Sequence, residues 1–132
     1  MGSADTVLSK AMAAKDTPSE DQEQAWLVAW LRREHPSVRI FAIPNGGGRS
    51  KAQGALLKAT GTSPGVPDLM LPVPRGQHHG LFVEMKRTKG GRISTEQKDW
   101  IAYLQANGYQ AIVCHGFEEA KKEIECYLST TS

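Results

Sequence analysis

Residues 17–34 carry apolar side chains at helical spacing. The members of this stripe recur three and four positions apart, as they do on one face of an α-helix: Leu27, Trp30 and Leu31. Thr17 and Glu20 form a Thr-x-x-Glu capping box, and Pro18 suits the first helical position. The pattern predicts a helix that begins near Pro18 and buries the stripe.

Four later segments combine β-branched or apolar residues with Gly and Pro at their ends, which is typical of strands. They are 38–44 (VRIFAIP), 68–73 (DLMLPV), 80–86 (GLFVEMK) and 109–116 (YQAIVCHG). The second and third are joined by the short connection PRGQHHG, which predicts an antiparallel hairpin. A helical segment separates the third from the fourth, and such a crossover favours parallel neighbours.

Helical signals fill the remaining segments. They are 50–60, with Ala52, Ala55, Leu56 and Ala59 expected inward; 94–108, capped by Ser94 and closed by Gly108; and 117–130. The order helix, strand, helix, strand, strand, helix, strand, helix predicts an α/β fold with a central mixed sheet of about four strands flanked by helices. We expect a single domain over 17–129, preceded by a weakly ordered N-terminal arm, 1–16.

Composition supports a globular chain of one domain. Its 132 residues are 39% hydrophobic and 23% charged. No apolar run is long enough to span a bilayer, and no segment has the pattern of a signal peptide. Cys114 lies in an apolar run and the two cysteines lack metal-like spacing, so we expect a reducing, cytoplasmic setting. Net charge is only +2, but acidic residues concentrate in 1–24, which leaves the remainder mildly basic and compatible with a polyanionic partner.

Three charged residues lie where the hairpin strands should meet. Alternation along LFVEMK puts Glu84 and Lys86 on one face of the sheet. The antiparallel course of the hairpin should bring Asp68, at the start of the preceding strand, close to both. Two carboxylates beside a lysine suit a hard cation such as Mg²⁺, with the lysine orienting a nucleophile or offsetting negative charge. A salt bridge at the strand edge is the competing interpretation.

The same residues carry a family resemblance. "GVPD", a spacer and "EMK" resemble the PD-(D/E)xK nuclease signature. The flanking segments "IPNGGGRS", "LLKATGTSPGVPDLML", "GLFVEMKRTKGGRISTEQKDWI" and "GYQAIVCHG" resemble the VRR-NUC branch, over residues 19 to 128. The resemblance implies a restriction-endonuclease-like core and cleavage of DNA with Mg²⁺, for which Mn²⁺ could substitute. It further implies that Asp68, Glu84 and the main-chain carbonyl of Met85 bind metal, while Lys86 serves the attacking water.

Members of this family usually add a carboxylate from the first helix. Glu23 shares the inward face with Leu27 and Trp30, and a buried acid is costly unless it is paired or metal-linked. Glu20 has a competing role in the capping box. We therefore favour Glu23 as a catalytic and metal-linked residue, with Glu20 as the alternative. Gln97, at a position where the family has a glutamine, is either a site residue or part of a Ser94-x-x-Gln97 capping box.

Basic and glycine-rich loops are candidates for holding phosphates. The candidates for nucleic-acid binding are Arg49, Lys51, Arg87, Lys89, Arg92 and Asn45. Solvated loops are the alternative for the basic residues, and Asn45-Gly is also a turn signal. The tryptophans, at helical spacing, favour packing over base stacking.

The function expected from these observations is a metal-dependent endonuclease. It would act on branched or structured DNA, such as four-way (Holliday) junctions or flaps, as a homodimer with one site for each strand. A compact stand-alone nuclease of this type suggests a bacterial or phage source. The alternatives are a nucleic-acid-binding module that keeps the fold without cleavage, and a scaffold in which the charged cluster is only an ion-pair network. No organic cofactor and no membrane is expected.

Overall fold

The computed structural model describes residues 17–44 and 50–131, and the helices and strands there follow one another in the order predicted. The elements are α2 (Glu20–Glu34), β1 (Phe41–Ala42), α3 (Lys51–Ala59), β2 (Leu69–Leu71), β3 (Leu81–Lys86), α4 (Thr95–Ala106), β4 (Gln110–His115) and α5 (Phe117–Ser129). The expected arm, residues 1–16, lies outside the described residues. No helix in the described part is long and apolar enough to cross a membrane.

The strands form one mixed sheet in the order β1-β2-β3-β4. β2 pairs antiparallel with both β1 and β3, and β3 pairs parallel with β4, as the hairpin and the crossover predicted. β1 and β2 are shorter than predicted. Pro44 and Pro72 lie close to their ends, and a proline has no N–H to extend a ladder.

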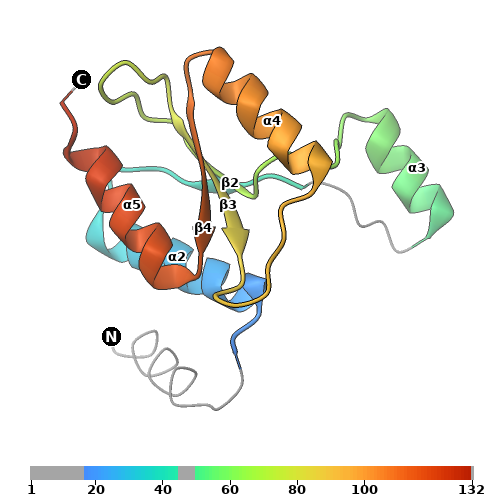
Figure 1. The fold of residues 1–132 in the computed structure, drawn as a ribbon, viewed down its shortest axis with the longest axis horizontal. Helices are drawn as coiled ribbons and strands as arrows, with labels where there is room; N and C mark the ends of the chain where they lie inside the picture. Colours follow the sequence, from blue (N-terminus) through green and yellow to red (C-terminus); the bar gives the residue numbers. More distant parts are fainter. Residues whose placement is uncertain (1–16, 45–49, 132) are drawn as a thin grey trace.

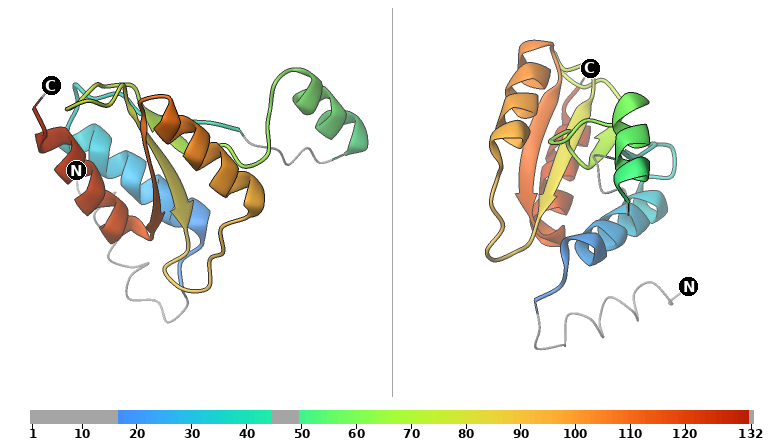
Figure 2. Two further views of the ribbon diagram at one scale, coloured as in Figure 1. Left: turned by 45° about the horizontal axis from the view of Figure 1, so that its top comes forward. Right: turned by 90° about the vertical axis from the view of Figure 1, so that its right-hand side faces the viewer.

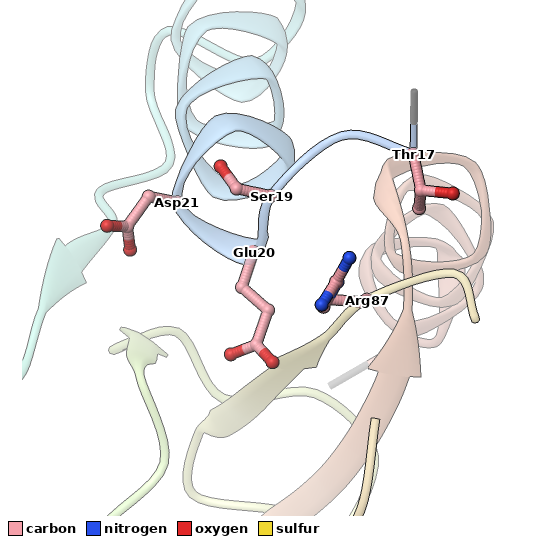
Figure 3. Close-up of a pocket in the computed structure, with 5 residues that line it drawn as sticks. All are labelled: Thr17, Ser19, Glu20, Asp21 and Arg87. Carbon is pink, nitrogen blue, oxygen red and sulfur yellow. The ribbon is translucent and has the colours of Figure 1, made fainter. Parts of the chain in front are cut away.

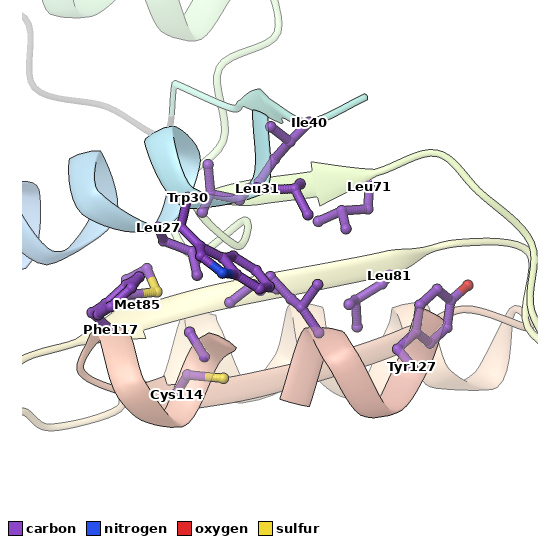
Figure 4. Packing of buried hydrophobic residues seen from close by; sticks show 14 residues of the cluster. Leu27, Trp30, Leu31, Ile40, Leu71, Leu81, Met85, Cys114, Phe117 and Tyr127 are labelled. Carbon is purple, nitrogen blue, oxygen red and sulfur yellow. The ribbon is translucent and has the colours of Figure 1, made fainter. Parts of the chain in front are cut away.

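Helices cover both faces of the sheet. Figures 1 and 2 show α2 and α5 side by side on one face and α4 on the other. The core lies between the sheet and the α2–α5 pair, where the predicted stripe of α2 is buried (Figure 4). Its members are Leu27, Trp30, Leu31, Ile40, Leu69, Leu71, Leu81, Val83, Met85, Cys114, Phe117, Ala120, Ile124 and Tyr127. The strands that carry or adjoin the charged residues Asp68, Glu84 and Lys86 are therefore held in place by this core.

The start of α2 differs from the prediction. Ser19, not Thr17, is the N-cap, and its hydroxyl oxygen accepts a hydrogen bond from the backbone N–H of Gln22 at 3.1 Å. The predicted Thr17–Glu20 capping box is therefore wrong. Because Ser19 caps the helix, Glu20 becomes its first residue and its side chain is not committed to a cap.

α3 also differs from the prediction, although it forms where expected. Figure 1 shows it standing away from the sheet, and no other helix or strand of the described chain packs on it. All four side chains expected inward are exposed: Ala52, Ala55, Leu56 and Ala59. The spacing identified an amphipathic helix correctly, but periodicity does not reveal whether another element covers the apolar face.

Candidate functional site

The hairpin brings the three charged residues together. Asp68 directly precedes β2, and the pairing of Leu69 with Val83 places it beside Glu84. The main-chain N–H of Met85 donates a hydrogen bond of 2.7 Å to Oδ2 of Asp68, which fixes the carboxylate against β3. The Met85 side chain points the other way, into the core, as strand alternation requires.

Glu84 is the centre of the cluster and is only 2% exposed. Its Oε2 accepts a hydrogen bond of 3.0 Å from Nε2 of Gln97 and lies 3.7 Å from Nζ of Lys86. Its Oε1 is buried and has no hydrogen-bond partner within the described structure. A buried oxygen in that position is costly, which marks it as an acceptor available to a ligand.

The surroundings oppose ionisation of Glu84. Burial above all, then the negative charge of Asp68, raise the pKa of its carboxyl from 4.5 to about 8, although Lys86 lowers it. A hydrogen bond between the Glu84 and Asp68 side chains also raises this pKa. The charge of Glu20 also raises the pKa of Glu84. Several negative groups therefore converge on one buried carboxyl with a single lysine against them, and such a cluster favours the addition of a cation.

Gln97 takes part in the capping box and also hydrogen-bonds Glu84 of the charged cluster. Its Oε1 accepts from the backbone N–H of Ser94 at 2.9 Å and completes a capping box at the start of α4. That bond turns Nε2 toward Glu84. The cap of α4 thus orients the amide that holds Glu84.

The two acids of α2 point to different places. In Figure 3 the carboxylate of Glu20 extends from the first turn of α2 toward the strands, with Arg87 beside it. Glu23 is buried, as its place on the inward face predicted, but its oxygens accept from Thr88 Oγ1 and Phe117 N, each at 2.7 Å. The structure therefore places Glu20, and not the favoured Glu23, on the side of the charged cluster. The missed signal was Ser19, which as N-cap frees Glu20.

The structure describes four of the candidate phosphate-binding residues. Lys51, Arg87, Lys89 and Arg92 are exposed, and the last three follow β3 in the loop that leads to α4. Arg49 and Asn45 lie outside the described residues. A basic loop at the exit of β3 is well placed to meet a polyanion approaching Glu84.

The cluster fits a magnesium-type site better than a cage of protein ligands. Among the described residues, no three His, Cys, Asp or Glu side chains group closely enough to hold a metal by themselves. Mg²⁺ keeps several waters and needs only one or two carboxylates with substrate oxygens. Such an ion would use the unpartnered Oε1 of Glu84 together with the neighbouring carboxylate of Asp68 as its protein ligands.

Together, the mixed sheet, the acidic hairpin and the adjoining lysine define a domain with a nuclease-type fold. The model of the VRR-NUC domain matches residues 5–118, and the chain belongs to this family. A solved structure described as a VRR_NUC domain protein is similar to it, with 27% identity, a TM-score of 0.78, and coverage of 89% of this chain and 93% of the other. No curated protein matches this chain.

Proposed function

We propose that this chain is a divalent-metal-dependent endonuclease that hydrolyses phosphodiester bonds of DNA. The observation that carries the proposal is the buried, unpartnered Oε1 of Glu84 next to Asp68. A salt bridge alone would leave this oxygen unsatisfied, because Lys86 lies near Oε2. In metal-free protein the protonated carboxyl of Glu84 can share its proton with Asp68, and a bound cation would replace that proton.

Asp68, Glu84 and the main-chain carbonyl of Met85 would hold the ion, with Glu20 taking the part first expected of Glu23. A Mg²⁺ ion bound there, or Mn²⁺ in its place, would polarise a phosphodiester and lower the pKa of a bound water. The bond from Met85 N to Asp68 and the bond from Gln97 to Glu84 fix both carboxylates before any ion arrives. Such preorganisation is what a reacting centre requires.

Lys86 would act on the nucleophile. Its side chain is 9% exposed and lies 3.7 Å from Glu84, so the ammonium is held beside the carboxylates rather than free in solvent. From there it can donate a hydrogen bond to an attacking water and offset the negative charge that develops on the phosphate.

DNA would be held by the loop after β3 and by α3. Arg87, Lys89 and Arg92 offer cations within one short loop, and Lys51 begins a helix that stands out from the sheet. We further propose a structure-selective activity on four-way junctions or flaps, carried out by a homodimer. One small domain covers little duplex, so two copies would place one site on each strand.

A cleavage panel tests this function. Linear, nicked, flap and four-way DNA would be incubated with the protein and Mg²⁺, Mn²⁺ or EDTA. We expect cutting of branched substrates only with metal, and loss of at least about 100-fold in rate for Asp68→Ala and Lys86→Ala. Asp21→Asn, on the exposed side of α2, is the matched control and should cut normally.

Two results would contradict the proposal. If the native protein binds DNA but leaves every substrate intact, the chain is a binding module. If calorimetry detects no binding of Mg²⁺ or Mn²⁺ even with DNA present, the charged cluster is only an ion-pair network.

A further inference from the structure

Glu23 joins three segments of the chain at one buried point. The residue is 5% exposed and belongs to the first turn of α2. Oε2 accepts from the hydroxyl of Thr88, just past the end of β3, and Oε1 accepts from the backbone N–H of Phe117, the first residue of α5, each at 2.7 Å. A buried carboxylate with both oxygens satisfied by short bonds fixes the segments that supply the donors.

The bond to Phe117 replaces a missing helix cap. Gly116 is the N-cap of α5 and offers no side-chain hydrogen bond to the helix. The carboxylate of Glu23 supplies that acceptor from another helix, at the end of α5 where the helix dipole favours a negative charge. This position gives Glu23 a structural reason to be buried without any metal.

The junction also holds the main chain of Lys86. The backbone N–H of Gly116 donates to the carbonyl of Lys86 at 3.0 Å, and Thr88 is tied to Glu23 two residues further on. Gly116 has a φ of 96°, and a Cβ there would lie 2.6 Å from Oγ1 of Thr88. The absence of a side chain at residue 116 is what lets these segments meet.

The other end of the junction reaches the charged cluster through Glu20. Glu20 and Glu23 lie three residues apart in the first turn of α2, so they are neighbours on the helix surface. Fixing Glu23 therefore fixes the height and rotation of the turn that presents Glu20 to Glu84. The bond from Thr88 to Glu23 holds the chain just after β3, and so fixes the position of Lys86, the last residue of that strand.

We propose that Glu23 is a positioning residue, which with Thr88 and Gly116 clamps the first turn of α2 to the end of β3 and so sets Glu20 and Lys86 around Glu84. This inference rests on the proposed metal-dependent function. It assigns Glu23 no direct part in metal binding, and it adds Thr88 to the residues on which the site depends.

Conservative variants separate positioning from direct participation. Glu23→Gln keeps an oxygen for Phe117 N and an amide that can donate to Oγ1 of Thr88, but it removes the charge. Thr88→Val removes one bond at nearly constant shape and is peripheral enough to fold, and Thr88→Ser restores the hydroxyl. Glu20→Gln removes a charge of the site itself and serves as the comparison.

Mn²⁺ binding is measured by calorimetry without DNA, and cleavage by steady-state kinetics. We expect Glu23→Gln to stay within about 3-fold of the native affinity and Thr88→Val to lose about 10-fold, as for residues that orient ligands. Thr88→Ser should recover the native Mn²⁺ affinity, and Glu20→Gln should bind Mn²⁺ more weakly than the native protein. Thr88→Val should lower kcat more than it raises KM for DNA, because the cations of the loop (Arg87, Lys89 and Arg92) are all retained.

Two results would overturn the inference. One is loss of Mn²⁺ binding in Glu23→Gln equal to that in Glu20→Gln, which would make Glu23 a participant in metal binding. The other is native affinity and native kcat in Thr88→Val.

Amide hydrogen exchange in metal-free protein keeps this inference separate from the proposed function. We expect faster exchange at Phe117 and over 86–88 in Thr88→Val than in the native chain. Unchanged exchange overturns the clamp whatever the activity. A native chain that binds no metal and cuts no DNA overturns the proposed function, while faster exchange in the variant still supports the clamp.

Discussion

Single residues of like chemistry have very different roles in this molecule because their neighbours differ. Glu84 and Glu23 are both buried acids, yet Glu84 keeps an unpartnered oxygen whereas Glu23 has a donor for each. The first has an oxygen left for a ligand, whereas both oxygens of the second are already bonded within the protein. Burial alone would not distinguish the two acids, because they differ in whether each carboxylate oxygen has a hydrogen-bond donor.

Metal-free protein should be less stable at high pH because of Glu84. Its pKa is raised in the folded state from 4.5 to about 8, so the folded state binds this proton more tightly than the unfolded state does. The stabilisation is fully present below the unfolded value of 4.5 and is lost as pH rises through about 8. Thermal unfolding in EDTA should show Glu84→Gln melting higher than the native protein at pH 8, by at least about 1 kcal/mol in unfolding free energy.

The matched control is Glu125→Gln, on an exposed position of α5, which should follow the native pH profile. Saturating Mg²⁺ should narrow the gap between Glu84→Gln and the native protein. Equal melting of Glu84→Gln and native protein across this pH range would contradict the role given to burial.

The two cysteines should react at very different rates. Cys114 is fully buried, and burial raises the pKa of its thiol to about 12, with the charges of Glu119 and Glu123 adding to the shift. Cys126 is exposed. Since the thiolate is the reactive form, a disulfide reagent at pH 8 should label one thiol at once and the second only as the protein unfolds. Cys126→Ser should abolish the fast phase, and two fast thiols in the native chain would contradict this.

At the scale of elements, β3 is the part on which the site depends. It is buried along almost its whole length and pairs with neighbours on both sides. One face of β3 carries the core residues and the other carries Glu84 and Lys86. α2 and α5 pack against β3, and α4 supplies Gln97, which bonds Glu84. α3 lacks such support, and none of its residues is buried.

Two glycines in different elements should respond oppositely to alanine. Gly116→Ala must adopt a φ of 96° and meets Thr88 at 2.6 Å, so it should cost about 1–3 kcal/mol. Gly54→Ala lies within α3 with nothing within 4 Å, and it should stabilise by about 0.4–1 kcal/mol. Denaturant unfolding measures both, and equal effects would contradict the strained junction at residue 116.

At the scale of the whole molecule, charge is arranged so that the acidic cluster is bordered by exposed cations. Net charge is only +2, so attraction of DNA would depend on local groups rather than on the overall field. The loop after β3 supplies Arg87, Lys89 and Arg92 next to the cluster. An anionic backbone could therefore approach carboxylates that would otherwise repel it.

DNA affinity should carry the salt signature of these contacts. In an Asp68→Asn background, which prevents cutting, Lys89→Ala with Arg92→Ala should weaken binding to all sequences alike. The slope of log affinity against log salt should fall by about 2, one for each lost phosphate contact. Lys122→Ala, on the exposed surface of α5, is the control, and an unchanged slope in the double variant would exclude the loop from the interface.

The sequence by itself determined the order of elements, the mixed sheet and the meeting of Asp68 with Glu84. These follow from local rules, because alternation, hairpin length and crossover length act over a few residues each. Helical spacing likewise predicted that Glu23 would be buried. The Ser94–Gln97 spacing predicted the capping box, though not that the same amide would also reach Glu84.

Only the tertiary structure decided what each buried acid touches. Glu23 meets Phe117 and Thr88 from distant parts of the chain, and no local pattern encodes that encounter. The exposure of Leu56, at 64%, was equally beyond the sequence, because a helix face is covered or bare according to which element packs on it. Periodicity fixes the direction of a side chain relative to its own element, whereas its partner depends on how the elements pack.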